Sequence, residues 1–238
     1  MFYYSSGVDI MGTIHDGHRQ RLKQRFVKEG LTSFESHNIL ELLLFYALPR
    51  QDTNVIAHEL IDNFKTLTGV FNAPYEELIK VKGLGENGAT LIKLIPQLLS
   101  AYTVETNANQ PMNDVRRICN YFHGLYIGVK TEKIHVCCLD DKLNIISCVL
   151  IQDGGVNTVP INVRKIVEAT YRSNSSMIIL SHNHPNGIPI PSDADIEATR
   201  KLYKILDSVG IKLLDHIVAS PKSAVSMKDA GYFNFFEI

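Results

Sequence analysis

The chain has 238 residues, 45% of them hydrophobic and 21% charged, and its 24 Lys and Arg side chains nearly balance its 25 Asp and Glu side chains. This composition is typical of a globular protein and excludes a disordered or fibrous chain. The balanced charge excludes a basic domain that binds nucleic acid through bulk electrostatics. Residues 1–16 lack the basic and apolar segments of a secretory signal, and no apolar run reaches the roughly 20 residues of a membrane span. We therefore expect a cytoplasmic protein with no membrane partner.

The apolar pattern of residues 12–103 has helical spacing and predicts an all-helical region. Proline, glycine and capping residues divide this region into several helices. Helix starts are expected at Ser36, at Asp52 or Thr53, and after Pro74; helix ends are expected at Gly30 and near Tyr102, and a kink is expected at Pro96. Residues 104–112 are polar, carry no apolar period and are expected to form a linker.

After the linker, strand and helix patterns alternate, which favours a mixed sheet with helices packed on it. The expected strands are 133–139, 145–151, 176–180 and 211–218, and the expected helices are 113–122, 162–172 and 192–209. The first two strands are separated by a short polar turn and predict a hairpin. The fold class is therefore expected to be α+β, with a helical domain over 1–103, a linker over 104–112 and an α/β domain over 113–238.

The four cysteines lie at positions 119, 137, 138 and 148, and no two of them have the C-x-x-C spacing. Cys137 and Cys138 are adjacent in a predicted strand, so their side chains would point to opposite faces of the sheet. We expect buried free thiols, because neither a disulfide framework nor a cysteine-based zinc site fits this spacing.

The stretch SHNHPNGIPIPSDAD at 181–195 carries the side chains with the strongest chemical signal. His182 and His184 lie two residues apart at the end of a predicted strand, so both imidazoles leave the same face. Ser192 is a good helix N-cap, and Asp195 falls in the first turn of the next helix, from where it can reach back towards the histidines. Two imidazoles and one carboxylate leave a fourth position open, as catalytic zinc sites require.

Each part of this stretch also has a simpler structural explanation. A single buried histidine is often a hydrogen-bonded core residue, and Ser192-x-x-Asp195 is also the pattern of a capping box. The combination of a His-x-His strand end, a rigid Pro/Gly loop and a carboxylate in the next helical turn favours the metal site.

The arrangement His182-x-His184-Pro185, six residues, then Ser192-x-x-Asp195 resembles the metal motif of the JAB/MPN (JAMM) metalloproteases. The full stretch, together with LLDHIV at 213–218 and VKGLGENGA at 81–89, is similar to the RadC family of bacterial proteins within that group.

The resemblance implies a JAB/MPN-like α/β domain and a zinc-dependent hydrolase that cleaves peptide or isopeptide bonds in a peptide or protein substrate. It implies that zinc is bound by His182, His184 and Asp195, and that the Ser192 hydroxyl stabilises the oxyanion. It also implies a glutamate that acts as general base near the start of an upstream strand. Glu132, directly before the predicted strand 133–139, matches that position best.

The sequence departs from the family pattern in two places. Many related sequences begin the helix after the hairpin with Pro-Arg-Glu, where this chain has Val163, Arg164 and Lys165. A glutamate that is often present in the second strand is replaced here by Cys148 and Val149. If either missing acid were the general base, the chain would bind a metal ion without hydrolysing a substrate.

Two roles are open for His216, which lies in an otherwise apolar strand. It is either a core histidine satisfied by backbone groups or a partner that orients a metal ligand. The neighbouring Asp215 shares both alternatives, and Arg164 and Ser226 are further candidates for a supporting role.

Gly83-Leu84-Gly85 between two predicted helices looks like a helix-hairpin-helix, a motif that commonly holds a nucleic-acid backbone. Free amides at the next helix start can bind a phosphate, whereas Glu86 at the same place would repel one. A structural helix corner and a protein-contact surface are equal alternatives to DNA binding. The second functional hypothesis is therefore a DNA-associated, repair-related protein whose metal site is structural or vestigial.

Overall fold

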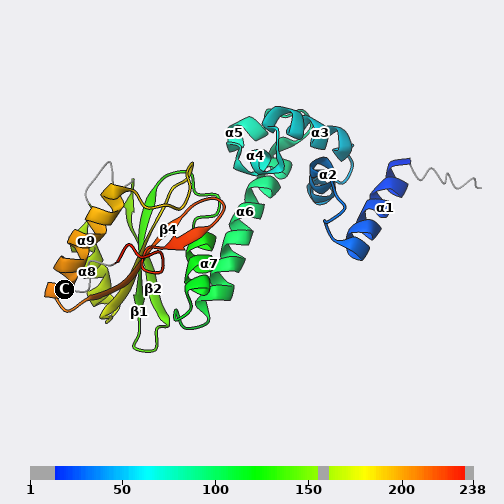
Figure 1. The fold of residues 1–238 in the computed structure, drawn as a ribbon. Helices are drawn as coiled ribbons and strands as arrows, with labels where there is room; N and C mark the ends of the chain where they lie inside the picture. Colours follow the sequence, from blue (N-terminus) through cyan, green and yellow to red (C-terminus); the bar gives the residue numbers. More distant parts are fainter. Residues whose placement is uncertain (1–13, 155–160, 234–238) are drawn as a thin grey trace, which may run out of the picture. The chain divides into compact units, whose positions relative to one another are not determined.

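The structure is a computed structural model that describes residues 14–154 and 161–233 (Figure 1). Helices occupy the first part of the chain, and strands alternate with helices in the rest. The expected α+β class is therefore confirmed. The chain divides into two compact units, Met1–Ile95 and Pro96–Ile238.

The first unit contains five helices and the start of a sixth within the described residues. They are α1 (Ile14–Glu29), α2 (Ser36–Ala47), α3 (Thr53–Phe64), α4 (Leu67–Asn72), α5 (Tyr75–Leu78) and the first part of α6 (Gly85–Ala108). Leu40, Leu60 and Ile92 are fully buried in one apolar core that α2 to α6 share, whereas Leu22 of α1 packs in a separate small cluster. The core explains why such short helices are stable, since isolated helices of this length are marginal in water.

The predicted helix caps are confirmed at one position and wrong at another. The Asp52 side chain accepts a hydrogen bond from the Asn54 amide and caps α3, as expected. Ser36 is the first helical residue of α2 rather than its cap, because Glu35 occupies the capping position and makes no side-chain bond there.

Two glycines form the predicted turn between α5 and α6. Gly83 has φ +83° and Gly85 has φ +60°, a left-handed backbone that glycine adopts without the Cβ penalty of other residues. Glu86 lies in the first turn of α6. The turn itself is confirmed, and its contact with DNA stays a prediction.

The prediction of an irregular linker is wrong for residues 104–108, because α6 continues to Ala108. Val104 and Ala108 pack against an apolar cluster of the second unit, and this burial stabilises the helix despite its polar sequence. The Asn107 side chain donates to the carbonyl of Thr103 one turn earlier, which satisfies its amide within the helix.

One mixed five-stranded sheet forms the centre of the second unit, in the order β2-β1-β3-β4-β5. Its strands are β1 (Lys133–Leu139), β2 (Ile145–Asp153), β3 (Met177–Asn183), β4 (Lys212–Ala219) and β5 (Ala224–Ser226). The predicted β1–β2 hairpin is confirmed, and β3 pairs antiparallel with β1 and parallel with β4. The strand β3 therefore lies at the centre of the sheet and continues three residues beyond its predicted end at Leu180.

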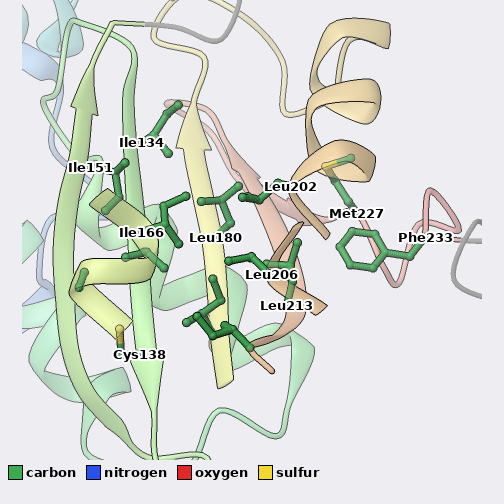
Figure 2. Packing of buried hydrophobic residues seen from close by; sticks show 14 of the residues in the cluster. Ile134, Cys138, Ile151, Ile166, Leu180, Leu202, Leu206, Leu213, Met227 and Phe233 are labelled. Carbon is green, nitrogen blue, oxygen red and sulfur yellow. The ribbon is translucent and has the colours of Figure 1, made fainter. Parts of the chain in front are cut away.

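Helices cover both faces of this sheet (Figure 1). Helices α8 (Val163–Arg172) and α9 (Asp193–Ser208) pack on one face, and α7 (Val115–Leu125) packs on the other. Figure 2 shows Ile166 of α8 and Leu202 of α9 packed against Leu180 of β3, in the core between these two helices and the sheet. This packing holds α9 against β3, the two elements that carry the predicted metal ligands.

All four cysteines are described and have free thiols, as expected, but Cys119 and Cys148 are only partly buried. Cys137 and Cys138 are both buried, on opposite faces of β1. Among the described helices, none has both the length and the apolar character that a membrane crossing needs.

A half-buried histidine, His135, on the α7 face of the sheet leads to a pH prediction. Burial, and to a smaller extent the charge of Lys133, lowers the pKa of His135 from 6.5 to about 4. The unfolded chain therefore binds more protons than the folded chain between pH 6.5 and 4. The free energy of unfolding should therefore decrease as the pH is lowered from 6.5 to 4, by at most about 1.4 kcal/mol per pH unit for one such histidine.

His135→Phe should make this pH dependence shallower, because phenylalanine cannot take up a proton in the unfolded state. Urea unfolding at several pH values between 4 and 7 measures the slope. The slope should not vanish, since burial also lowers the pKa of His216 well below its ordinary value. An identical slope in the variant and the wild type would contradict the prediction.

Candidate metal centre

The side chains of His182, His184 and Asp195 converge on one point at the end of β3. The two histidine Nε2 atoms lie 3.0 Å apart. Asp195 Oδ1 lies 3.4 Å from His182 Nε2, and Asp195 Oδ2 lies 3.6 Å from His184 Nε2. One donor atom from each residue lies within 4.8 Å of the other two. Three side chains expected from the sequence to act together are therefore adjacent in the fold.

The three donor atoms fit a single zinc ion. Zinc binds histidine nitrogen and carboxylate oxygen at about 2.0–2.2 Å, so tetrahedral donors are about 3.3 Å apart. The separations of 3.0 Å between the two nitrogens, 3.4 Å from His182 Nε2 to Asp195 Oδ1 and 3.6 Å from His184 Nε2 to Asp195 Oδ2 are close to that value, with a different carboxylate oxygen facing each histidine. His182 and Asp195 are buried, whereas the His184 side chain is 21% exposed. The donor set therefore has one side open to solvent.

Local structure explains how Asp195 reaches the histidines. Ser192 caps α9, and its Oγ accepts a hydrogen bond from the Asp195 amide at 3.2 Å. In return, Asp195 Oδ2 accepts bonds from the Ser192 amide at 2.8 Å and from the Ser192 hydroxyl at 2.6 Å. This reciprocal pair is a capping box. The simpler structural explanation and the metal site are therefore compatible, because the box orients the carboxylate.

The electrostatics of the site favour a cation. Burial opposes ionisation of Asp195, but its close contacts with His182 and His184 and the hydrogen bond from the Ser192 hydroxyl outweigh it and hold the pKa of the carboxyl well below its ordinary value. The same carboxylate raises the pKa of His184 through their direct contact. Asp195 is therefore ionised throughout the physiological pH range and supplies a buried negative charge between the two imidazoles.

A chain of hydrogen bonds behind the site determines which nitrogen of His182 carries its proton. The Thr199 hydroxyl donates to the Asp195 carbonyl at 2.6 Å, so it accepts from His216 Nδ1, also at 2.6 Å. His216 is fully buried, and burial lowers its pKa well below 6.5, so its ring is neutral and its Nε2 is an acceptor. His182 Nδ1 lies 2.8 Å from that Nε2 and must donate to it. The lone pair on His182 Nε2 therefore faces Asp195 and His184.

This chain decides between the two roles left open for His216, in favour of a partner that orients His182. Thr199 was missed by sequence reasoning. It lies four residues after Asp195 in α9 and so on the same face of the helix, and that spacing was the available signal.

Asp215 and Ser226, two further candidates for a supporting role, bond to each other rather than to the three donor residues. Asp215 accepts bonds from the Ser226 hydroxyl at 2.5 Å and from the Lys228 amide at 3.1 Å, which ties β4 to β5 and the turn after it. Burial raises the pKa of Asp215. Asp215 and Ser226 therefore hold the chain around β5.

Glu132, the expected general base, lies directly before β1. Its carbonyl accepts a hydrogen bond from the Gly154 amide at 2.7 Å. Glu132 lines a pocket of about 390 Å³ together with His184 and Ser192. The structure thus brings all five sequence-predicted site residues to one end of the sheet, with three of them around one pocket.

Lys165 and Cys148, the two departures from the family pattern, make their contacts away from the pocket at Glu132. Lys165 Nζ donates to the carbonyl of Ile151 at 3.0 Å, which ties the start of α8 to β2. Cys148 packs against the apolar cluster beneath α7. Within the described part of the chain, neither side chain is among those that line the pocket at Glu132.

Comparison with known proteins agrees with the site. A family model described as "RadC-like JAB domain" matches residues 112–232. A UPF0758 protein of Fusobacterium nucleatum is 33% identical over 225 residues, which cover 91% of this chain and 97% of that protein. A UPF0758 protein of Ruegeria pomeroyi is 33% identical over 218 residues, which cover 90% and 96% of the two chains. The chain belongs to the RadC family. The RadC resemblance noted in the sequence is therefore confirmed, and it extends through the helical unit as well as the sheet.

Proposed function

We propose that this RadC protein is a zinc-dependent hydrolase of peptide or isopeptide bonds. The observation that carries the proposal is the convergence of His182, His184 and Asp195 beside a pocket that Glu132 and Ser192 also line. The match of residues 112–232 to a RadC-like JAB domain supports this reaction class.

The residues around the pocket supply the groups that such a hydrolysis needs. A bound zinc ion would polarise the substrate carbonyl and lower the pKa of a water molecule that it binds from about 15.7 to about 7. The Glu132 carboxylate takes the proton of the attacking water and passes it to the leaving amine. The Ser192 hydroxyl donates to the oxyanion after it turns away from Asp195, to which it donates in the substrate-free structure. The place of Glu132 in the pocket supports it as the base. With Glu132 as the base, catalysis does not need the acids that related sequences carry where this chain has Cys148 and Lys165.

A direct assay tests the proposed function. Protein stripped with a chelator and reloaded with one equivalent of zinc should cleave members of a quenched-fluorescent peptide pool or an isopeptide-linked pool. The stripped protein and His184→Ala should cleave neither pool. Stoichiometric zinc binding without cleavage of either pool would contradict the proposal and favour a structural or vestigial metal site.

Thr199→Val tests the hydrogen-bond chain behind His182. Valine has nearly the shape of threonine but leaves His216 Nδ1 and the Asp195 carbonyl without their shared hydroxyl. We expect zinc affinity to fall about 10–100-fold, the usual cost of removing a partner that orients a metal ligand. Competition with a fluorescent zinc chelator measures the affinity, and ¹⁵N NMR of the His182 ring measures its tautomer. Unchanged affinity together with an unchanged tautomer would show that the chain has no orienting role.

A further inference from the structure

Asn183 lies between the two histidines of the metal site, but its side chain leaves the opposite face of β3. It is 2% exposed, and both ends of its amide group are used. Asn183 Oδ1 accepts a hydrogen bond from the Lys133 amide at 2.7 Å, and Asn183 Nδ2 donates to the Thr131 carbonyl at 3.0 Å. Thr131 and Lys133 are the two neighbours of Glu132 in the chain. One buried side chain therefore holds the backbone on both sides of the proposed general base.

The amide takes over where backbone pairing between β1 and β3 stops. The antiparallel register of these strands ends at the pair Ile134 and His182. The next position of β3 is Asn183, and its side chain provides one donor and one acceptor in place of another backbone pair.

We propose that Asn183 is a positioning residue that sets the place of Glu132 relative to His182 and His184. This proposal rests on the proposed function, in which Glu132 is the base and the histidines are zinc ligands. Because Asn183 is the chain neighbour of both histidines, its two hydrogen bonds connect the base to the metal site through only a few covalent bonds. Such short connections on a central strand hold catalytic groups in place better than a loop does.

Other described contacts of this segment lead to the end of β2, and the Tyr126 hydroxyl donates to the Lys133 carbonyl at 3.4 Å. The Glu132 carbonyl accepts from Gly154, the Thr131 hydroxyl donates to Asp153 Oδ1 at 2.9 Å, and Lys133 Nζ lies 3.1 Å from Asp153 Oδ2. Loss of the Asn183 amide would therefore leave the segment attached to the edge strand while releasing it from β3. Only an amide side chain of this length supplies both a donor and an acceptor here, which explains asparagine at this position.

Asn183→Asp is the sharpest test, because it conserves size and the acceptor for Lys133 but places an oxygen against the Thr131 carbonyl. Repulsion between the new carboxylate and the Thr131 carbonyl should displace the segment from β3, so we expect exchange of the Lys133 amide hydrogen, measured by NMR, to accelerate at least tenfold even though an acceptor remains. Zinc affinity should stay within about threefold of wild type, because His182 remains on the paired central strand and the His184 amide keeps its bond to the Ala219 carbonyl. The kcat for peptide cleavage should fall about 10–100-fold with little change in KM. In a Glu132→Gln background, the same substitution should cause no further loss of kcat.

Asn144→Ala is the matched control. Asn144 bonds to Asp140 in the turn at the opposite end of the β1–β2 hairpin, so its loss loosens the same hairpin away from Glu132. This variant should keep the wild-type kcat and Lys133 exchange rate. Wild-type kcat in Asn183→Asp, or an equal loss of kcat with and without Glu132, would overturn the proposal.

An activity-independent readout separates this proposal from the proposed function. If the wild type cleaves no peptide, the proposed function fails, and Lys133 exchange together with the absorption band of cobalt(II)-loaded protein decides the role of Asn183. The band should change in Asn183→Asp in the same direction as in Glu132→Gln. An unchanged exchange rate or an unchanged band in Asn183→Asp would overturn the positioning role.

Discussion

Glu132→Gln should lower kcat by about 10²–10⁴-fold, the usual contribution of a general base, and should leave zinc binding intact. Glutamine has the size of glutamate but cannot take a proton from water. Glu132 lines the pocket at His184 without belonging to the group of donor atoms, so its substitution removes chemistry rather than a ligand. Rates with a cleaved peptide and the zinc content of the same samples measure the two effects.

Glu197→Gln is a suitable control for this prediction. Glu197 lies on α9, two residues after Asp195, and pairs with Arg200 and Lys201 at the surface. Surface pairs of this kind contribute little to stability, so the variant should keep wild-type kcat and zinc content. If Glu132→Gln retains wild-type kcat, another group must accept the proton, and the base assignment is wrong.

The features that could be predicted from the sequence depend on contacts close together in the chain. Alternation of apolar residues predicts β1 and β2, and the side-chain period of two places His182 and His184 on one face. The capping-box spacing from Ser192 to Asp195 places the carboxylate in the first turn of α9. These local rules were sufficient to bring the three side chains of the candidate metal centre into one prediction.

The features that could not be predicted depend on contacts between distant residues. His216 meets His182 across 34 residues, and Asn183 meets Lys133 across 50 residues, so neither contact leaves a local pattern. Residues 104–108 have a polar sequence that resembles a linker, and they are helical because Val104 and Ala108 pack on a core built from later residues. Tertiary packing overrode local propensity there, as it commonly does.

Asp195→Ala should abolish stoichiometric zinc binding, because it removes the only carboxylate in the group of donor atoms. Zinc that binds only the folded chain stabilises it by about 2.7 kcal/mol when free zinc is 100 times the Kd. The wild type should therefore gain thermal stability on zinc addition, whereas Asp195→Ala should gain none. Calorimetric titration with zinc and thermal unfolding with and without zinc measure both effects.

Ser192→Ala separates loss of the ligand from loss of the capping box. Both substitutions break the reciprocal bonds at the start of α9, and removal of a capping hydroxyl costs about 0.5–2 kcal/mol in the zinc-free protein. Ser192→Ala keeps all three donors, so it should still bind one zinc per chain and gain stability from it. If zinc stabilises Asp195→Ala as much as Ser192→Ala, the carboxylate is not a ligand. The two histidines and Asp195 would then be neighbours through the capping box alone.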